Sequence, residues 1–204
     1  MEDIKIGSSL SFRGYNWRVL YIEDNAALII TEDIIEQRPY HDDYKDITWA
    51  ECGLRKYLNG EFYDKFNDTD KSRIIEVTNK NLDNPWYGTK GGDDTKDSIF
   101  LLGIEDVVCR YFGDSSEKLQ NRSKKQNYWF QRKDENNNKR IAKFMGYDYW
   151  WWLRSPGRIN RVAAYVHGNP GGCVGINRNS VFFRSFGAQR DGGVRPALWL
   201  KLEL

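Results

Sequence analysis

The most informative stretch of this chain reads WWLRSPG, residues 151–157, and a further tryptophan precedes it at position 150. Large aromatic side chains favour burial because exposing their apolar surface to water is costly. A Pro-Gly pair typically forms a turn. We therefore expect the three tryptophans to pack in the core, with stacking on a ligand as the alternative. The chain should leave the core at Pro156-Gly157.

The segment after this turn consists of short apolar pieces separated by glycine and asparagine. The pieces are 163–166, 173–174, 181–183 and 194–200. A spacing of roughly ten residues between such pieces is typical of short antiparallel strands joined by tight turns. Terminal strands commonly return to the start of a domain, so we expect 197–200 to pair beside the N-terminal strand.

The N-terminal part alternates between apolar and polar side chains in a way that predicts three strands, at 9–12, 17–22 and 26–31. Thr48 and Glu51 have the spacing of a capping box, which predicts that a helix begins at Thr48. A shorter helix is expected to hold Phe62, Tyr63 and Phe66.

Two apolar segments in the middle of the chain complete the predicted elements. Residues 98–102 are expected to form a short strand and residues 104–112 a helix. The whole pattern predicts an α+β fold with short antiparallel strands, two main helices and long loops. We expect one domain over 1–204, with a long loop at 79–97 and a mobile, polar insertion at 113–140.

Composition excludes several classes of function. The net charge is only +2, which provides no general attraction for nucleic acid or anionic membranes. No apolar run reaches the length of a membrane span, and the acidic start MEDIKIGSSL does not resemble a signal peptide. We expect a cytoplasmic protein by default, although export or incorporation into a virion by a partner stays open.

The residues that would support catalysis or metal binding are scarce. Cys52, Cys109 and Cys173 are far apart and form no CxxC pair, so we expect three small buried side chains. There are only two histidines, His41 and His167, and no motif of nucleophilic or phosphate-transfer catalysis. The sequence therefore predicts no catalytic residues, no cofactor and no metal site.

Five segments resemble, in the same order, those of a family of uncharacterised bacterial and phage domains. They are YNWRVL at 15–20, LRKYLN at 54–59, DSIFLL at 97–102, WWLRSPG at 151–157 and GVRPAL at 193–198, of which the last two are specific. The resemblance spans nearly the full chain. It implies a C-type-lectin-like fold of the subtype shared with formylglycine-generating enzymes.

Some members of that family resemble the variable proteins of diversity-generating retroelements, in which adenines of a C-terminal cassette are rewritten. Asparagine codons treated in this way cannot encode Lys, Glu, Gln, Met or Trp. These five types supply 41 of the 204 residues, yet residues 158–188 contain none of them. Independent draws would give such an absence roughly once in a thousand stretches. Exclusion of long side chains by short, glycine-rich strands is the alternative explanation.

The known activities of related folds are not implied for this chain. Formylglycine-generating enzymes use a pair of active-site cysteines, whereas Cys173 stands alone in this region. Calcium-binding lectins use acidic side chains, and no Asp or Glu occurs between 158 and 188. The resemblance instead implies a ligand surface within the subregion 150–204.

The residues expected to bind a protein or glycan ligand lie in 158–188 and mix cationic, aromatic and small polar types. They are Arg158, Asn160, Arg161, Tyr165, His167, Asn169, Ile176, Arg178, Phe182, Arg184 and Phe186. Each could equally be an ordinary strand or turn residue. The motif residues Trp151, Trp152, Arg154 and Arg195 are expected to be structural, with the two arginines as internal hydrogen-bonding pins or, alternatively, as anion ligands.

These observations favour a non-enzymatic recognition protein with a diversified C-terminal surface. Two alternatives remain open. One is a degenerate formylglycine-generating-enzyme-like domain that binds a small molecule or glycan in a cleft beneath residues 158–190. The other is a structural module of a phage particle, which would form stable oligomers.

Overall fold

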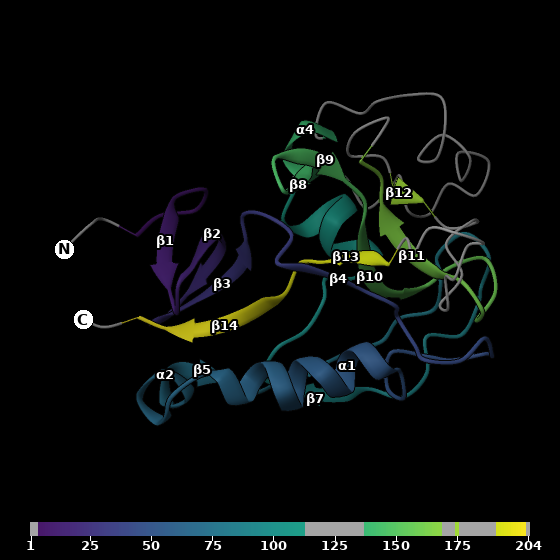
Figure 1. Ribbon diagram of the computed structural model, residues 1–204, viewed down its shortest axis with the longest axis horizontal. Coiled ribbons are helices and arrows are strands. Elements are labelled where there is room, and N and C mark those ends of the chain that lie inside the picture. The colour runs from purple at the N-terminus through teal and green to yellow at the C-terminus, as the bar shows by residue number, and fades with distance from the viewer. Residues whose placement is uncertain (1–3, 113–136, 169–173, 176–190, 203–204) are drawn as a thin grey trace.

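Two five-stranded sheets organise the chain in the computed structural model, which describes residues 4–112, 137–168, 174–175 and 191–202 (Figure 1). Short helices and long connections surround them. This arrangement confirms the predicted α+β fold with short antiparallel strands. Among the described residues, no helix combines the length and the apolar character needed to cross a membrane.

The first sheet has the order β1-β2-β3-β14-β5. Its members are β1 (Ser9–Phe12), β2 (Tyr15–Glu23), β3 (Ala26–Thr31), β14 (Ala197–Lys201) and β5 (Ile74–Ile75). Arg13 and Asp24, at positive φ of 54° and 49°, allow the tight turns that join the first three strands. The predicted N-terminal strands are therefore confirmed. Strand β14 was expected beside the N-terminal strand, but it pairs with β3, whereas β1 pairs with β2 at the edge of the sheet.

The second sheet has the order β12-β11-β10-β13-β4. Its members are β10 (Trp151–Pro156), β11 (Ala163–Val166), β12 (Val174–Gly175), β13 (Gly192–Val194) and β4 (Glu36–Arg38). Strands β10 and β13 run parallel and the other pairs antiparallel. The tryptophan motif therefore forms the central strand of this sheet.

Two short connections join the sheets. Residues 32–35 lead from β3 to β4, and Arg195-Pro196 leads from β13 to β14. Figure 1 shows both sheets side by side, with the yellow chain of β13 and β14 running from one to the other. Because both connections are short, the two sheets cannot separate without breaking strand pairs.

Three consecutive helical segments follow β4, the edge strand of the second sheet, along the chain. They are α1 (Gly53–Tyr57), the π-helical turn η1 (Leu58–Phe62) and the 3₁₀ turn η2 (Tyr63–Lys65), and Figure 1 shows them below both sheets. The ring of Phe62 lies 5.9 Å from the ring of Tyr15, so these helical segments pack against the hairpin of β1 and β2. The short predicted helix around Phe62 is thus part of this longer series of segments.

The predicted helix start at Thr48 is wrong. Residues 49–51 form a turn, and α1 begins at Gly53 after the N-cap Cys52, whose sulfur accepts a hydrogen bond from the Arg55 amide at 3.4 Å. The Thr48 carbonyl accepts the amides of Glu51 and Cys52, at 3.3 and 3.1 Å, but Cys52 is extended, with ψ of 154°, so this turn does not continue into α1. The indole Nε1 of Trp49 in this turn donates to Asp97 at 3.1 Å.

The central part of the chain contributes small elements. These are α2 (Asp68–Arg73), the hairpin β6 (Val77–Asn79) and β7 (Thr95–Asp97), η3 (Asp106–Arg110), α4 (Asn137–Arg140) and the hairpin β8 (Ala142–Phe144) and β9 (Tyr147–Tyr149). The predicted helix at 104–112 exists, although much of it is a π-helix. The predicted strand at 98–102 is wrong, because only Phe100 forms a bridge, to Ala197. Of the three cysteines expected to be buried, Cys52 is buried, Cys109 is only partly buried, and Cys173 lies outside the described residues.

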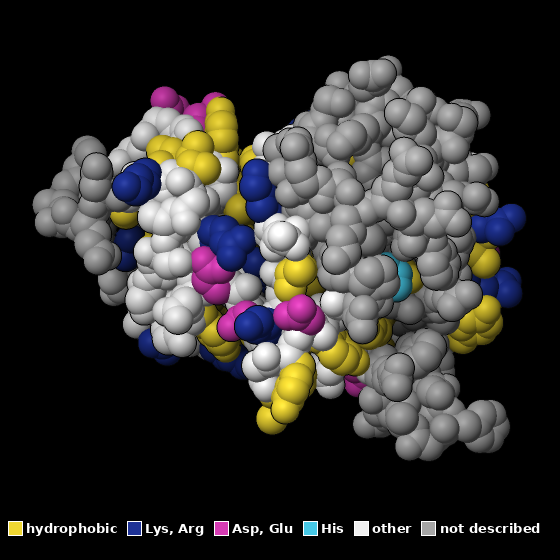
Figure 2. Space-filling view, turned by 90° about the horizontal axis from the view of Figure 1, so that it is seen from above, with side chains coloured by type: hydrophobic (Ala, Val, Ile, Leu, Met, Phe, Trp, Pro, Cys, Tyr) yellow, Lys and Arg dark blue, Asp and Glu magenta, His cyan; other side chains and the backbone are white. Residues whose placement is uncertain are grey.

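Charges are not segregated on the surface that Figure 2 presents. Basic, acidic and apolar side chains alternate over its described part. This distribution agrees with the net charge of +2 and offers no extended basic or acidic field there.

Candidate functional site: the surface that follows the tryptophan strand

Strand β10 places both of its tryptophans in the core. Trp151 and Trp152 are fully buried, and each indole Nε1 donates to a backbone carbonyl at 3.0 Å, that of Arg140 and that of Arg38 respectively. Their polar atoms are therefore satisfied, as buried indoles require. Trp150 is half-buried, and its ring lies at a T-shaped angle 4.6 Å from that of Trp152.

Arg195 lies fully buried at the junction of the two sheets. Its Nε donates to the carbonyl of Thr31 at 2.8 Å and its Nη2 to that of Glu32 at 3.1 Å. The guanidinium carbon lies 5.0 Å from the ring centre of Trp151. Burial lowers the pKa of Arg195, but a guanidinium starts so high that it stays charged at neutral pH. The side chain thus links β3 to the tryptophan strand.

Arg154 also contacts the protein interior. Its Nη1 donates to the Leu101 carbonyl at 2.8 Å and to Asp106 Oδ2 at 2.7 Å, in an ion pair that is almost entirely buried. Gly103 adds a backbone N–H bond to the same carboxylate at 2.8 Å. Arg154 therefore joins β10 to the helical turn η3 through a carboxylate that receives two donors.

The first predicted binding residues lie in the exposed turn between β10 and β11. The guanidinium of Arg158 lies 5.5 Å from the ring centre of Tyr87, and that of Arg161 lies 5.7 Å from the ring centre of Tyr44. These pairs have the geometry of cation–π contacts. We call this surface the arginine edge; it consists of Tyr44, Asp46, Tyr87, Arg158, Ile159, Asn160 and Arg161.

The arginine edge combines charged, aromatic and aliphatic groups that water can reach. Tyr44 is 60% exposed and Ile159 is 51% exposed. Arg161 Nε also donates to Asp46 at 2.9 Å, in an ion pair whose side chains are about half exposed or more. Such an exposed pair contributes little to stability, so both charges remain available to a ligand.

A side chain that the sequence did not single out holds this edge in place. Asn84 is buried and donates from Nδ2 to the carbonyls of Pro156 and Gly157, at 2.9 and 3.2 Å. Its Oδ1 accepts the backbone N–H groups of Trp86 and Tyr87. One amide therefore positions both the end of the tryptophan strand and the tyrosine under Arg158. The Asn-Pro pair at 84–85 indicates a turn, but its partners lie about seventy residues away and could not be inferred from it.

Three more hydrogen bonds hold the arginine edge, two through its backbone carbonyls and one through the Asn160 side chain. Thr89 Oγ1 donates to the Arg158 carbonyl at 2.7 Å, and Asn160 Nδ2 donates to the Lys90 carbonyl at 2.9 Å. The amide of Ile47 donates to the Asn160 carbonyl at 3.2 Å. The two loops that contain these residues thus hold the edge from both sides while leaving its side chains exposed.

Tyr165 does not fit the expected exposed surface. It is only 1% exposed, because β11 lies between β10 and β12 and the ring of Trp150 packs 5.6 Å away. Its hydroxyl lies 3.0 Å from Nε2 of the half-buried His167. Tyr165 thus lies beneath the surface, and His167 only partly reaches it. The other predicted binding residues lie outside the described part of the chain: Asn169, Ile176, Arg178, Phe182, Arg184 and Phe186. Most of the predicted insertion, 113–136, also lies outside it.

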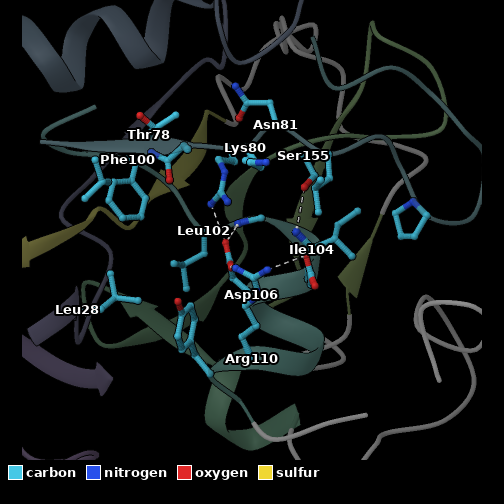
Figure 3. A pocket seen from close by; sticks show the side chains of 18 of the residues that line it. Leu28, Thr78, Lys80, Asn81, Phe100, Leu102, Ile104, Asp106, Arg110 and Ser155 are labelled. Atoms are coloured by element: carbon cyan, nitrogen blue, oxygen red, sulfur yellow. Dashed lines mark hydrogen bonds and ion pairs between the residues drawn. The ribbon is translucent and has the colours of Figure 1, made fainter. Parts of the chain in front are cut away.

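A separate cavity of about 450 Å³ has Arg154 and Ser155 in its lining (Figure 3). Residues 77–83 form one wall, and residues 100–106 with Ser155 form another. Leu28 and Trp199 of the first sheet close its base. The cavity reaches β10 at Arg154 and Ser155 and includes no described residue of the arginine edge. Within the described segments, no three His, Cys, Asp or Glu side chains are grouped as a metal site.

Comparison with known proteins adds the family. A family model described as "Domain of unknown function (DUF6273)" matches residues 24–202, most of the chain. The chain belongs to this family. The match includes the tryptophan strand, Arg195 and the arginine edge, whereas β1 and β2 precede it. Neither the curated proteins nor the solved structures give a match for this DUF6273 domain.

Proposed function

We propose that this DUF6273 domain is a non-enzymatic recognition protein that binds a protein or glycan through a C-terminal surface starting at the arginine edge. One observation carries the proposal: a buried strand is followed directly by an exposed turn that contains cationic, apolar and polar side chains. Trp151 and Trp152 are buried, whereas Arg158, Ile159 and Arg161 are exposed within the next ten residues.

The rigid part supports recognition because a preorganised surface loses less entropy on binding. The edge is bonded to the Thr89 hydroxyl, the Lys90 carbonyl and the Ile47 amide, which belong to loops 42–47 and 83–90. Buried Asn84 fixes the point where the turn leaves the sheet. Side chains on such a frame can change without disturbing the core.

The exposed part has the chemistry of an interface. Arginine and tyrosine are enriched among the residues that contribute most to binding, and a cation held over a ring presents both groups in one patch. Ile159 adds exposed apolar area between the two arginines. A protein epitope or a sugar ring, each with apolar and hydrogen-bonding faces, suits this combination.

We further propose that the scaffold is C-type-lectin-like and that the surface is diversified by a retroelement. Arg158, Asn160 and Arg161 are all reachable from asparagine codons by adenine changes, whereas the tryptophans of the fixed strand are not. The absence of Lys, Glu, Gln, Met and Trp over 158–188 supports the same conclusion. The genomic locus tests it: a near-copy repeat differing at adenines and a neighbouring reverse transcriptase are expected, and their absence contradicts diversification here.

Binding itself is tested with a double variant, Arg158→Ala with Arg161→Ala. Both the wild type and the variant are applied to arrays of purified cell-surface glycans and envelope proteins, and hits are measured by biolayer interferometry. Loss of the two guanidinium groups should weaken a hit by about 2 kcal/mol or more, about thirtyfold, as for interface hot spots. The melting temperature should stay within about 1–2 °C of the wild type, because surface changes alter stability little.

The matched control removes two exposed lysines elsewhere, Lys96→Ala with Lys143→Ala. It should retain binding, because it lowers the net charge equally without touching the arginine edge. Equal loss in both double variants would show a general charge effect and contradict the proposal. Stable oligomers by light scattering, with no hit on either array, would favour the module of a phage particle instead.

A further inference from the structure

We propose that the cavity beside Arg154 binds a small amphipathic monoanion, a carboxylate attached to an aromatic or branched apolar body. This site is separate from the arginine edge and does not rest on the recognition function. Its volume of about 450 Å³ lies within the range of roughly 300–1,000 Å³ that small-molecule sites occupy.

The inner part of the cavity is apolar. Leu28, Phe100 and Leu102 lie behind its surface and are almost completely buried, whereas Val77 and Tyr111 are partly buried and Leu82 is 51% exposed on it. Trp199 is half-buried beside them, with its ring in edge contact with that of Tyr21 at 6.2 Å. An apolar ligand body placed against these side chains would replace water on surfaces that make no hydrogen bonds, which is the main source of affinity in such sites.

Arg154 supplies directed donors at the inner wall. The Nη1 atom of Arg154 donates both hydrogen bonds that this side chain makes with described residues, to the Leu101 carbonyl and to Asp106. Nε and Nη2 have no acceptor in the described part of the protein, although the side chain is only 11% exposed. A ligand oxygen in the cavity can accept from these groups, because a guanidinium has five N–H donors.

Among the described charged side chains around the cavity, one cation makes no ion pair. Asp83 pairs with Lys90 at 2.7 Å, Glu105 with Arg110 at 3.4 Å and Asp106 with Arg154 at 2.7 Å. Lys80 lies on the wall, is exposed, and makes no ion pair or hydrogen bond with any described residue. Figure 3 shows Lys80 and Asp106 on opposite sides of the space.

This balance selects the charge of the ligand. A single negative charge would be attracted by Lys80 and would accept hydrogen bonds from Arg154. A phosphate dianion would also lie near the carboxylates of Glu105 and Asp106, which repel a second charge. Ser155 Oγ accepts the Ile104 amide at 2.9 Å, and no described histidine lines the cavity to act as its general base. The proposal is therefore one of binding.

The probes are 2-naphthoate and its neutral counterpart 2-naphthalenemethanol, measured by isothermal titration and by saturation-transfer NMR. The full chain should bind one equivalent of 2-naphthoate, more tightly than the alcohol. Lys80→Met keeps most of the aliphatic stem but removes the charge. It should weaken naphthoate about two- to fivefold, the effect of an exposed ion pair, and leave the alcohol unchanged.

Two further variants locate the site. Lys143→Met makes the same change on an exposed strand outside the cavity and should bind both probes like the wild type. Thr78→Trp places an indole at an exposed position of the wall and should abolish both, with the melting temperature confirming that the variant folds. Arg158→Ala with Arg161→Ala should bind both probes normally, which separates this site from the recognition surface.

Three results would overturn the proposal. One is the absence of binding of both probes up to about 1 mM, the weak limit for a specific site. Another is binding that a folded Thr78→Trp variant retains. The third is an equal affinity for the acid and the alcohol that Lys80→Met does not change, which would refute the anionic ligand.

Discussion

Replacing Arg195 with methionine should destabilise the protein strongly, because this side chain joins the two sheets. It donates to the carbonyls of Thr31, Glu32 and Arg140 at 2.8, 3.1 and 3.4 Å from a fully buried position. Arg140 keeps a second donor, the Trp151 indole, so two carbonyls lose a charged donor that nothing replaces. Hydrogen bonds to charged groups contribute about 1.5–3 kcal/mol each, which predicts a loss of about 3–5 kcal/mol in the free energy of unfolding.

The assay is chemical denaturation in urea, with thermal unfolding as a second measurement. A loss of this size should lower the melting temperature by roughly 10 °C in a domain of this length. Arg158→Met makes the same change at an exposed position and should stay within about 0.5 kcal/mol of the wild type. Arg195→Lys, which keeps the charge but not the planar fork, should fall between the two.

One outcome would refute this reasoning about Arg195. Among the described residues no carboxylate is bonded to this guanidinium, so its desolvation opposes the hydrogen bonds it makes. If Arg195→Met is as stable as the wild type or more so, desolvation outweighs the bonds. The junction would then be held by strand pairing alone.

Two other predictions concern Gly192 and His41. A Cβ at Gly192 would lie 2.2 Å from Trp152 Nε1. Gly192→Ala should therefore lower the free energy of unfolding, measured in urea, by about 2 kcal/mol or more. Gly60→Ala is the control: its Cβ would have no atom within 4 Å, and it should not destabilise the protein. Burial lowers the pKa of His41 below its ordinary 6.5, and its Nδ1 accepts the Gly53 amide, which needs the unprotonated ring. The unfolded chain therefore binds the proton more readily. Stability should be full above about pH 7 and should fall as the pH drops through 6.5 toward the lower folded pKa. His41→Gln should flatten this difference when unfolding is measured across that range; an unchanged slope would contradict it.

Local patterns were sufficient for much of the fold. The alternation at 9–12, 17–22 and 26–31 predicted three strands that the structure contains, because the alternation of side chains along a strand is written in neighbouring residues. Prediction failed at Thr48, where the capping-box spacing is present but the turn that follows ends at the extended residue Cys52. The spacing marks a turn and does not determine whether that turn continues as a helix.

The candidate site divides in the same way. Its exposed turn after Pro156-Gly157 was predictable from composition, since a Pro-Gly pair ends the strand and Arg158 and Arg161 favour water. Tyr165 was assigned to the surface from its residue type alone, and its burial between β10 and β12 came from the order of strands in the sheet. The support from Asn84 required two segments about seventy residues apart to meet.

The amino-acid sequence alone therefore determined the α+β class, the burial tendency of Trp151 and Trp152, and the unusual composition of 158–188. These properties depend on side-chain type and on near neighbours. Tertiary structure determined the partners of Arg154 and Arg195, the loops that hold the arginine edge, and the cavity between Leu28, Lys80 and Phe100. Each of these brings together groups from distant parts of the chain, and such contacts exist only after the two sheets have closed around a common core.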